Sequence, residues 1–92
     1  MNIKELQKLL DSSGVSEIYY SLSSNSHPKA DTFGQLRVLP SGEYEVSTVE
    51  RGERYDVKTF VSENDACIWF LKDGGLGLHY QKIAEYIKTV AA

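Results

Sequence analysis

Apolar residues recur at the spacing of an α-helix near both ends of the chain. In the N-terminal segment, Ile3, Leu6 and Leu10 fall on one stripe, and Asn2 is placed to cap the first turn. The C-terminal stripe consists of Leu76, Tyr80, Ile83, Ala84, Ile87 and Val90. These two patterns predict a first and a last helix.

A third helix is predicted in the segment 62–73. Ser62 is placed to cap it, and the acids Glu63 and Asp65 are favourable at the positive end of a helix dipole. The run 66–71 is apolar almost all round, so this helix has to be covered on more than one side. The glycine pair at 74–75 ends it, and we expect the last helix to supply part of the cover.

The segment between the helices alternates with the period of β-strands. In 15–22 the alternation places Ile18, Tyr20 and Leu22 on one buried face. The following residues, 23–34, are polar and rich in turn formers, and they predict a loop.

Two hairpins follow, and their registers agree with each other. The first places Val38 opposite Tyr44, and the second, which turns at Arg51, places Val46 opposite Val57. Both registers put the same six residues on one face: Leu36, Val38, Tyr44, Val46, Tyr55 and Val57. The other face carries a row of alternating charge: Arg37, Glu45 and Lys58. Since a one-residue slip would mix the apolar and charged sets, the agreement predicts an antiparallel meander.

The predicted order of elements is α-β-β-β-β-α-α. This is an α+β fold in which a four-stranded antiparallel sheet carries an N-terminal helix and two C-terminal helices on one face. Residues 1–92 are sufficient for one domain. No apolar run approaches the roughly 20 residues that cross a bilayer, so we expect no membrane contact. The single cysteine, Cys67, favours a reducing compartment, and we expect a cytoplasmic protein.

The net charge of −3 is unevenly distributed along the chain. The segment 43–73 contains eight acids and four bases, a net charge of −4, and the remaining residues sum to +1. An acidic middle argues against binding nucleic acid, which needs a basic face. Most such charges are simply solvated surface, but the distribution also suits a basic protein partner.

One predicted pairing brings like charges together. In the second hairpin Glu50 lies opposite Glu53, where two carboxylates repel each other. Arg51 and Arg54 are close enough in sequence to relieve this repulsion locally. The alternative is that a lysine or arginine of a partner lies between the two acids in a complex.

The sequence contains no recognisable catalytic or metal-binding motif. His27 and His79 do not form an HExxH or a Cys/His ligand spacing. Cys67 lies in the apolar helix, where a buried side chain is more typical than an activated thiolate. We therefore expect no enzyme, no cofactor and no metal. An enzyme that uses either histidine in an unrecognised site is the alternative.

Six tyrosines and one tryptophan are many for a chain of this length, and such side chains often anchor interfaces. Tyr44 and Tyr55 fall on the predicted core face, and Trp69 is expected to pack between helices. Tyr19 points away from the buried face and Phe33 lies in the predicted loop. These last two are the aromatic contact candidates.

The segment 50–70 carries a resemblance to a known group of proteins. A strand ends in Glu50-Arg51-Gly52, a second strand closes with Phe60, and Ser62-Glu63 leads into an apolar helix with Ala66-Cys67. This arrangement resembles small immunity proteins of bacterial polymorphic-toxin and contact-dependent growth inhibition systems. The likeness extends loosely to 15–22 and 42–46.

The resemblance implies a cytoplasmic inhibitor that binds the C-terminal toxin domain of a delivered effector in a 1:1 complex. By family analogy the toxin is often a nuclease, commonly an RNase, with a basic active-site cleft that the inhibitor blocks or holds closed. The expected contact residues are Glu43, Glu50, Arg51, Glu53, Arg54, Asp56, Tyr19 and Phe33. The alternative is a regulatory or adaptor module that binds another protein through the same surface.

Overall fold

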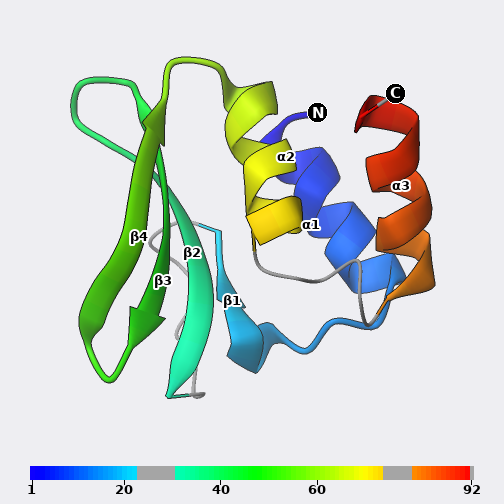
Figure 1. Cartoon of the computed structure of the whole chain (residues 1–92), viewed down its shortest axis with the longest axis horizontal. Coiled ribbons are helices and arrows are strands. Elements are labelled where there is room, and N and C mark those ends of the chain that lie inside the picture. The colour runs from blue at the N-terminus through cyan, green and yellow to red at the C-terminus, as the bar shows by residue number, and fades with distance from the viewer. Residues whose placement is uncertain (23–30, 74–79, 92) are drawn as a thin grey trace.

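The computed structural model describes residues 1–22, 31–73 and 80–91, and these form an α+β fold (Figure 1). The elements in chain order are α1 (Ile3–Ser12), η1 (Glu17–Tyr19), β1 (Tyr20–Ser21), β2 (Thr32–Val38), β3 (Tyr44–Glu50), β4 (Glu53–Phe60), α2 (Glu63–Asp73) and α3 (Gln81–Ala91). The predicted fold class and order of helices and strands are confirmed, with η1, a short 3-10 helix, as an addition.

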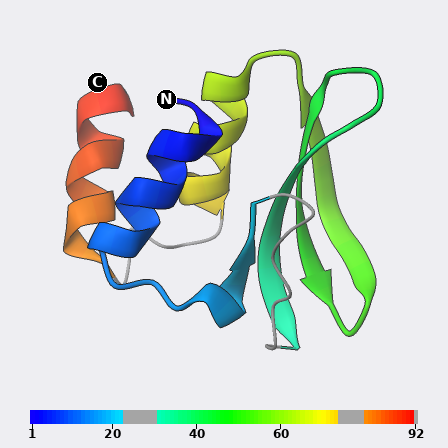
Figure 2. The ribbon, with the colours of Figure 1, turned by 180° about the vertical axis from the view of Figure 1, so that it is seen from behind.

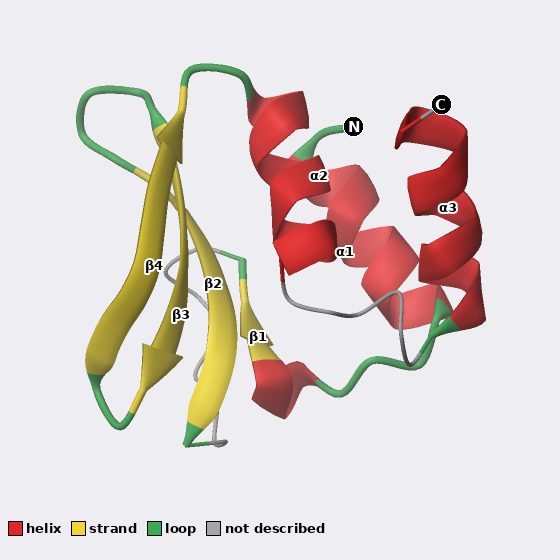
Figure 3. Cartoon of the chain, viewed as in Figure 1, coloured by secondary structure: helices red, strands yellow, loops and turns green. Residues whose placement is uncertain are grey.

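The three α-helices lie on the same side of the sheet (Figure 3). Helix α2 contacts β2, β3 and β4, whereas α1 and α3 contact α2 and each other. The view from behind shows α1 and α3 as an outer layer over α2 (Figure 2). The apolar helix is therefore covered on two sides, as its composition predicts, and Ala66, Cys67, Phe70 and Leu71 are buried.

The sheet is mixed and not purely antiparallel as predicted. Its strand order is β1-β2-β3-β4, and the first pair, Tyr20 with Gly34 and Ser21 with Gln35, runs parallel. The predicted first strand is also shorter, because Ser16 caps η1 and accepts a hydrogen bond from the Ile18 amide at 3.4 Å. Ile18 is exposed as a result and does not lie on the predicted buried face.

The first predicted hairpin register is confirmed. Val38 pairs with Tyr44, Leu36 pairs with Val46, and Arg37 lies opposite Glu45 on the outer face of the sheet. The strand β2 begins earlier than the sequence pattern indicates, at Thr32. Phe33 and Gly34, which were predicted in the loop, are therefore strand residues.

The second hairpin register holds only near its turn. Glu50 pairs with Glu53 as predicted, but a β-bulge follows, in which Asp56 has a positive φ of 52°. Val46 therefore lies opposite Lys58 and not opposite Val57. A bulge adds one residue to a strand and reverses the alternation beyond it, and Val57 is 51% exposed.

The bulge also changes the predicted charge row. Glu45 is opposite Thr59, and Lys58 is on the helix side of the sheet, where its ammonium lies 4.0 Å above the Trp69 ring. Trp69 in turn packs against Phe60, with 6.0 Å between ring centroids. Trp69, which was predicted between helices, thus lies on α2 against Phe60 and Lys58 of β4.

Two more residues of the predicted core face, Val38 and Tyr55, are also exposed. Helix α2 has 11 residues and rises about 16 Å, whereas β4 has eight residues and extends about 26 Å. Because α2 starts just after β4 ends, it does not reach the end of the hairpin at Tyr55 (Figure 1). Val38 lies at the other end, opposite Tyr44, and this difference in length does not explain its exposure.

The ring of Phe70 on α2 packs against β2 at Gly34. A Cβ atom at this position would lie 3.1 Å from Cε2 of Phe70, which is tighter than ordinary van der Waals contact. The absence of a side chain at Gly34 therefore leaves room for the Phe70 ring. The core around this contact includes the fully buried Leu36, Leu71 and Cys67.

We predict that Gly34→Val lowers the free energy of unfolding by about 1–3 kcal/mol, because the added methyl groups overlap the Phe70 ring. In the double variant with Phe70→Leu the smaller side chain leaves room, so the two costs should be less than additive. Urea denaturation followed by Trp69 fluorescence measures both. Thr32→Val is the control, since it introduces the same side chain on the same strand at an exposed position. Simple additivity of the two costs would contradict the contact.

Candidate interaction surface

The turn between β3 and β4 brings the two predicted carboxylates together. Arg51 and Gly52 both have positive φ, at 50° and 84°, as a two-residue hairpin turn with the twist of its strands requires. The turn fixes Glu50 opposite Glu53. Tyr55, two residues after Glu53 on the same face, donates a hydrogen bond from its hydroxyl to Glu53 Oε2 at 2.7 Å. This hydrogen bond to a carboxylate is the main reason why the pKa of Tyr55 is raised.

The neighbouring arginine does not neutralise this pair. Arg54 lies on the outer face, where its Nε donates to Gln35 Oε1 at 3.2 Å and is 3.8 Å from Glu45 Oε1. Arg37 binds the same carboxylate at 2.8 Å. Within the described residues the ion pairs closer than 4 Å all involve Glu45, so Glu50 and Glu53 have no cation at that distance.

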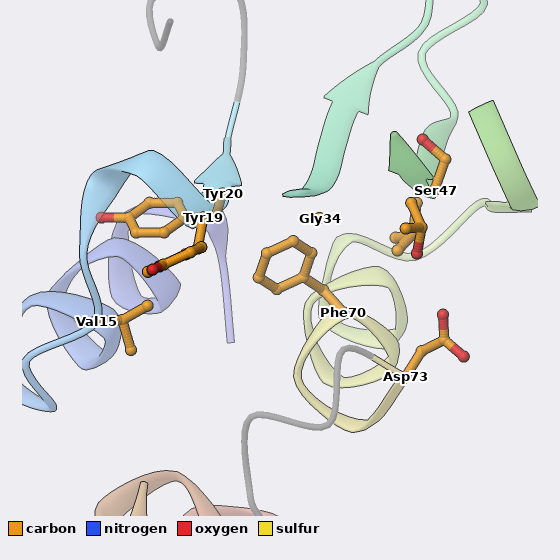
Figure 4. A pocket seen from close by; sticks show the side chains of 9 residues that line it. Val15, Tyr19, Tyr20, Gly34, Ser47, Phe70 and Asp73 are labelled. Atoms are coloured by element: carbon orange, nitrogen blue, oxygen red, sulfur yellow. The ribbon is translucent and has the colours of Figure 1, made fainter. Parts of the chain in front are cut away.

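A cleft lies on the helix side of the sheet, between η1 and the C-terminal end of α2 (Figure 4). Its cavity volume is small, about 50 Å³. Tyr19 and Tyr20 lie on one side of the Phe70 ring and Asp73 lies on the other (Figure 4). Val15 and Gly34 complete its apolar lining.

The two tyrosines of the cleft have different roles. Tyr20 is buried, its hydroxyl accepts a hydrogen bond from Gln7 Nε2 at 2.7 Å and donates to Asp11 Oδ1 at 3.4 Å, and burial raises its pKa. Tyr20 thus ties the cleft wall to α1. Tyr19 is 52% exposed at the rim and is available for contact with a partner.

The structure divides the eight predicted contact residues among several places. Glu50, Arg51 and Glu53 are together at the turn, and Tyr19 is at the cleft rim on the same side of the sheet. Arg54 and Phe33 are on the outer face, where both flank Val49.

The other two predicted contacts lie away from the turn. Glu43 is near the opposite end of the sheet, seven residues from Glu50 and thus about 23 Å along the strand. Asp56 is exposed in the bulge of the edge strand. The predicted set therefore does not form one continuous patch.

Two residues of this surface were not identified from the sequence. Tyr55 has the predicted orientation, but it is exposed because α2 is too short to cover it; comparing the lengths of the helix and the strand would have shown this. Asp73 ends α2 and lines the cleft. Its position depends on how α2 packs against the sheet, which no local pattern indicates.

Other reactive groups add little to this surface. Burial raises the pKa of the Cys67 thiol from its ordinary 9.0 to about 11, so the thiol is protonated at neutral pH. His27 and His79 lie outside the described residues. In the described part of the chain, no group of three or more His, Cys, Asp or Glu side chains is placed to hold a metal ion.

None of the helices within the described ranges has both the length and the apolar character needed to cross a bilayer. Comparison of the chain with protein-family models, with curated proteins and with solved structures gives no match.

We predict that Cys67 reacts with an aromatic disulfide reagent at pH 8 far more slowly in the folded protein than in 6 M guanidinium, because the folded thiol is buried and protonated.

The raised pKa of Cys67 also predicts a pH dependence of stability. Since the pKa of the thiol is higher in the folded than in the unfolded protein, its contribution to stability is complete below about pH 9 and is lost as the pH rises toward 11. The free energy of unfolding, taken from denaturation curves between pH 8 and 11, should therefore decrease less steeply with pH for Cys67→Ala than for the unaltered chain. Equal slopes for the two proteins would contradict the raised pKa.

Proposed function

We propose that this chain is an immunity protein that binds and neutralises a bacterial toxin domain in the cytoplasm. The resemblance over residues 50–70 supports this class, and the hairpin end of the sheet supports the mode of action. The proposed contact surface consists of Glu50, Glu53 and Tyr55 with the adjoining cleft between Tyr19 and Asp73. In this proposal the chain inhibits another protein by binding to it in a 1:1 complex, and it catalyses no reaction itself.

The observation that carries the proposal is the opposed pair of Glu50 and Glu53. Two carboxylates directly across a strand pair destabilise the free protein, and the described residues place no cation within 4 Å of them. A cation from a partner would remove this repulsion on binding. The repulsion between Glu50 and Glu53 is thus unfavourable in the isolated chain but would be relieved in a complex.

The chemistry of a nuclease fits such a surface. An enzyme that binds a phosphate backbone needs Lys or Arg side chains around its substrate cleft. A row of carboxylates on a protein can pair with the same cations, speed the encounter and exclude substrate. We therefore propose a nuclease, and an RNase by family analogy, as the target, with its active site occluded.

The aromatic side chains supply the second part of such an interface. Tyr55 is 46% exposed and is hydrogen-bonded to Glu53. Tyr19 is 52% exposed and lines the cleft. Tight interfaces usually depend on a few aromatic anchors surrounded by polar groups. The turn geometry and the contact of α2 with the sheet hold these groups in place before binding, which lowers the entropy lost in the complex.

We predict that the double charge reversal Glu50→Lys and Glu53→Lys weakens binding of the toxin domain about tenfold or more and reduces protection of cells that express the toxin. The two introduced lysines would then repel the basic surface of the toxin domain, which the two glutamates attract. The measurement is a pull-down and titration with the product of the reading frame directly upstream, co-expressed with this chain, together with a growth assay.

The matched control is Glu43→Lys with Glu85→Lys, which makes the same change in net charge away from the hairpin end. It should leave affinity and protection close to those of the unaltered chain. Equal weakening by both double variants would show that only net charge matters and would contradict this surface. Capture of a partner that is not a toxin would favour the adaptor alternative.

A further inference from the structure

The two edges of the sheet differ in length. Strand β1 at one edge has only two residues, which leaves little backbone for another chain to pair with. Strand β4 at the other edge has eight residues, and the first seven of them are exposed. A long exposed edge strand can pair with a strand of another chain unless something interrupts it. In β4 the interruption is the bulge at Asp56.

The bulge is an extra residue in β4. Between the paired positions Tyr55 and Lys58, β4 has two residues, whereas β3 has one residue between their partners. Asp56 takes up the extra length with a φ of 52°, a left-handed conformation that is unfavourable for residues other than glycine. Its side chain is exposed, and no hydrogen bond or ion pair to its carboxylate is found among the described residues. A side-chain contact of this kind therefore does not explain the conformation.

The packing of β4 does not need the extra residue. Counted without Asp56, the strand alternates regularly and keeps every other residue on the face that it occupies now. Lys58 would still lie over Trp69, and the hairpin turn would be unchanged. The helix-side residues would be Glu53, Tyr55, Lys58 and Phe60, and the outer residues Arg54, Val57 and Thr59. Removal of Asp56 would therefore change mainly the edge.

A regular β4 would be complementary to a second copy of itself. Two such strands, paired antiparallel about a twofold axis at Val57, would align along their whole length. Directly opposite side chains would lie on the same face, and no like charges would be opposed. The opposed pairs would be Val57 with Val57, Tyr55 with Lys58, Arg54 with Thr59 and Glu53 with Phe60.

We infer that the bulge at Asp56 prevents two copies of this chain from pairing along β4. The extra residue puts the two halves of the strand out of step, so a second copy meets backbone groups at the wrong spacing. The chain stays monomeric in this way, and the hairpin end stays free of a second copy. The inference does not depend on the proposed function, because it concerns only copies of this chain.

The test is deletion of Asp56 in the full chain, followed by sedimentation velocity over a range of concentrations. We expect the unaltered chain to stay monomeric up to about 0.5 mM and the deletion variant to form a dimer with a dissociation constant on the order of 0.1 mM, as a small interface can supply. The fluorescence of Trp69 checks the fold, and it should be nearly unchanged because Lys58 keeps its place over the ring.

Asp56→Gly separates the shape of the bulge from its charge. Glycine adopts a positive φ without steric cost, so this variant keeps the bulge and loses the carboxylate. It should stay monomeric like the unaltered chain. Association of Asp56→Gly to the same degree as the deletion variant would show that charge, and not the bulge, protects the edge, and it would overturn the inference.

Cross-linking tests the register of the dimer. Val57→Cys in the deletion variant places two thiols opposite each other, at a distance that a disulfide can bridge, so mild oxidation should give a covalent dimer. Thr59→Cys in the same variant is the control. Its thiol lies opposite Arg54 of the second copy, and the two introduced thiols are about 13 Å apart along the strand. Cys67 is buried in the described structure and should not take part.

Two further results would overturn the inference: a deletion variant that folds but stays monomeric, or an unaltered chain that pairs along β4. If the deletion prevents folding, Val57→Cys and Thr59→Cys are compared in the chain that retains Asp56. Both should then form covalent dimers equally slowly, because the bulge blocks the edge. Faster cross-linking of Val57→Cys there would contradict the inference.

Discussion

The position of α2 against the sheet is the constraint on which the rest of this structure depends. The helix rests on β2, β3 and β4, and α1 and α3 are held behind it. Phe70 packs on Gly34, where an added Cβ atom would lie only 3.1 Å from the ring. The same contact forms the floor of the cleft, so the packing that stabilises the fold also creates the hollow that we assign to a partner.

The length of α2 separates the molecule into a covered part and an open part. Near the Phe60 end of β4, Trp69 of the helix packs against Phe60 and Lys58 lies over the Trp69 ring. Toward the turn none of the described α-helices lies above the same face of the hairpin, which carries Glu50, Glu53 and Tyr55 (Figure 1). The covered part supplies stability, so the open part can retain an unfavourable carboxylate pair. Departures of this kind from local rules are typical of functional surfaces.

The features that the sequence predicts correctly are the ones with local signals. The periodicities of 3.6 and 2 identify the helices and the hairpins, and the Arg51-Gly52 turn fixes Glu50 opposite Glu53. The bulge at Asp56 has no such signal, because an aspartate in the left-handed region leaves no periodic trace.

The remaining differences have non-local causes. The two residues of β1 are too few for a pattern to show their direction. The exposure of Tyr55 and the position of Asp73 depend on where one element ends relative to another. The acidic pair of the candidate site was therefore predictable, whereas the cleft beside it was not.

The edge strand β4 gives a reason to assign partner binding to the hairpin end and not to strand addition. An exposed edge invites pairing with another chain, and proteins commonly prevent this with bulges and charged side chains. In β4 the positive φ of Asp56 interrupts the edge, and Arg54 turns onto the outer face toward Glu45. A partner strand would meet a broken row of backbone groups there. The face at the turn presents fixed carboxylates and an aromatic cleft, which a folded basic surface can contact without rearranging the sheet.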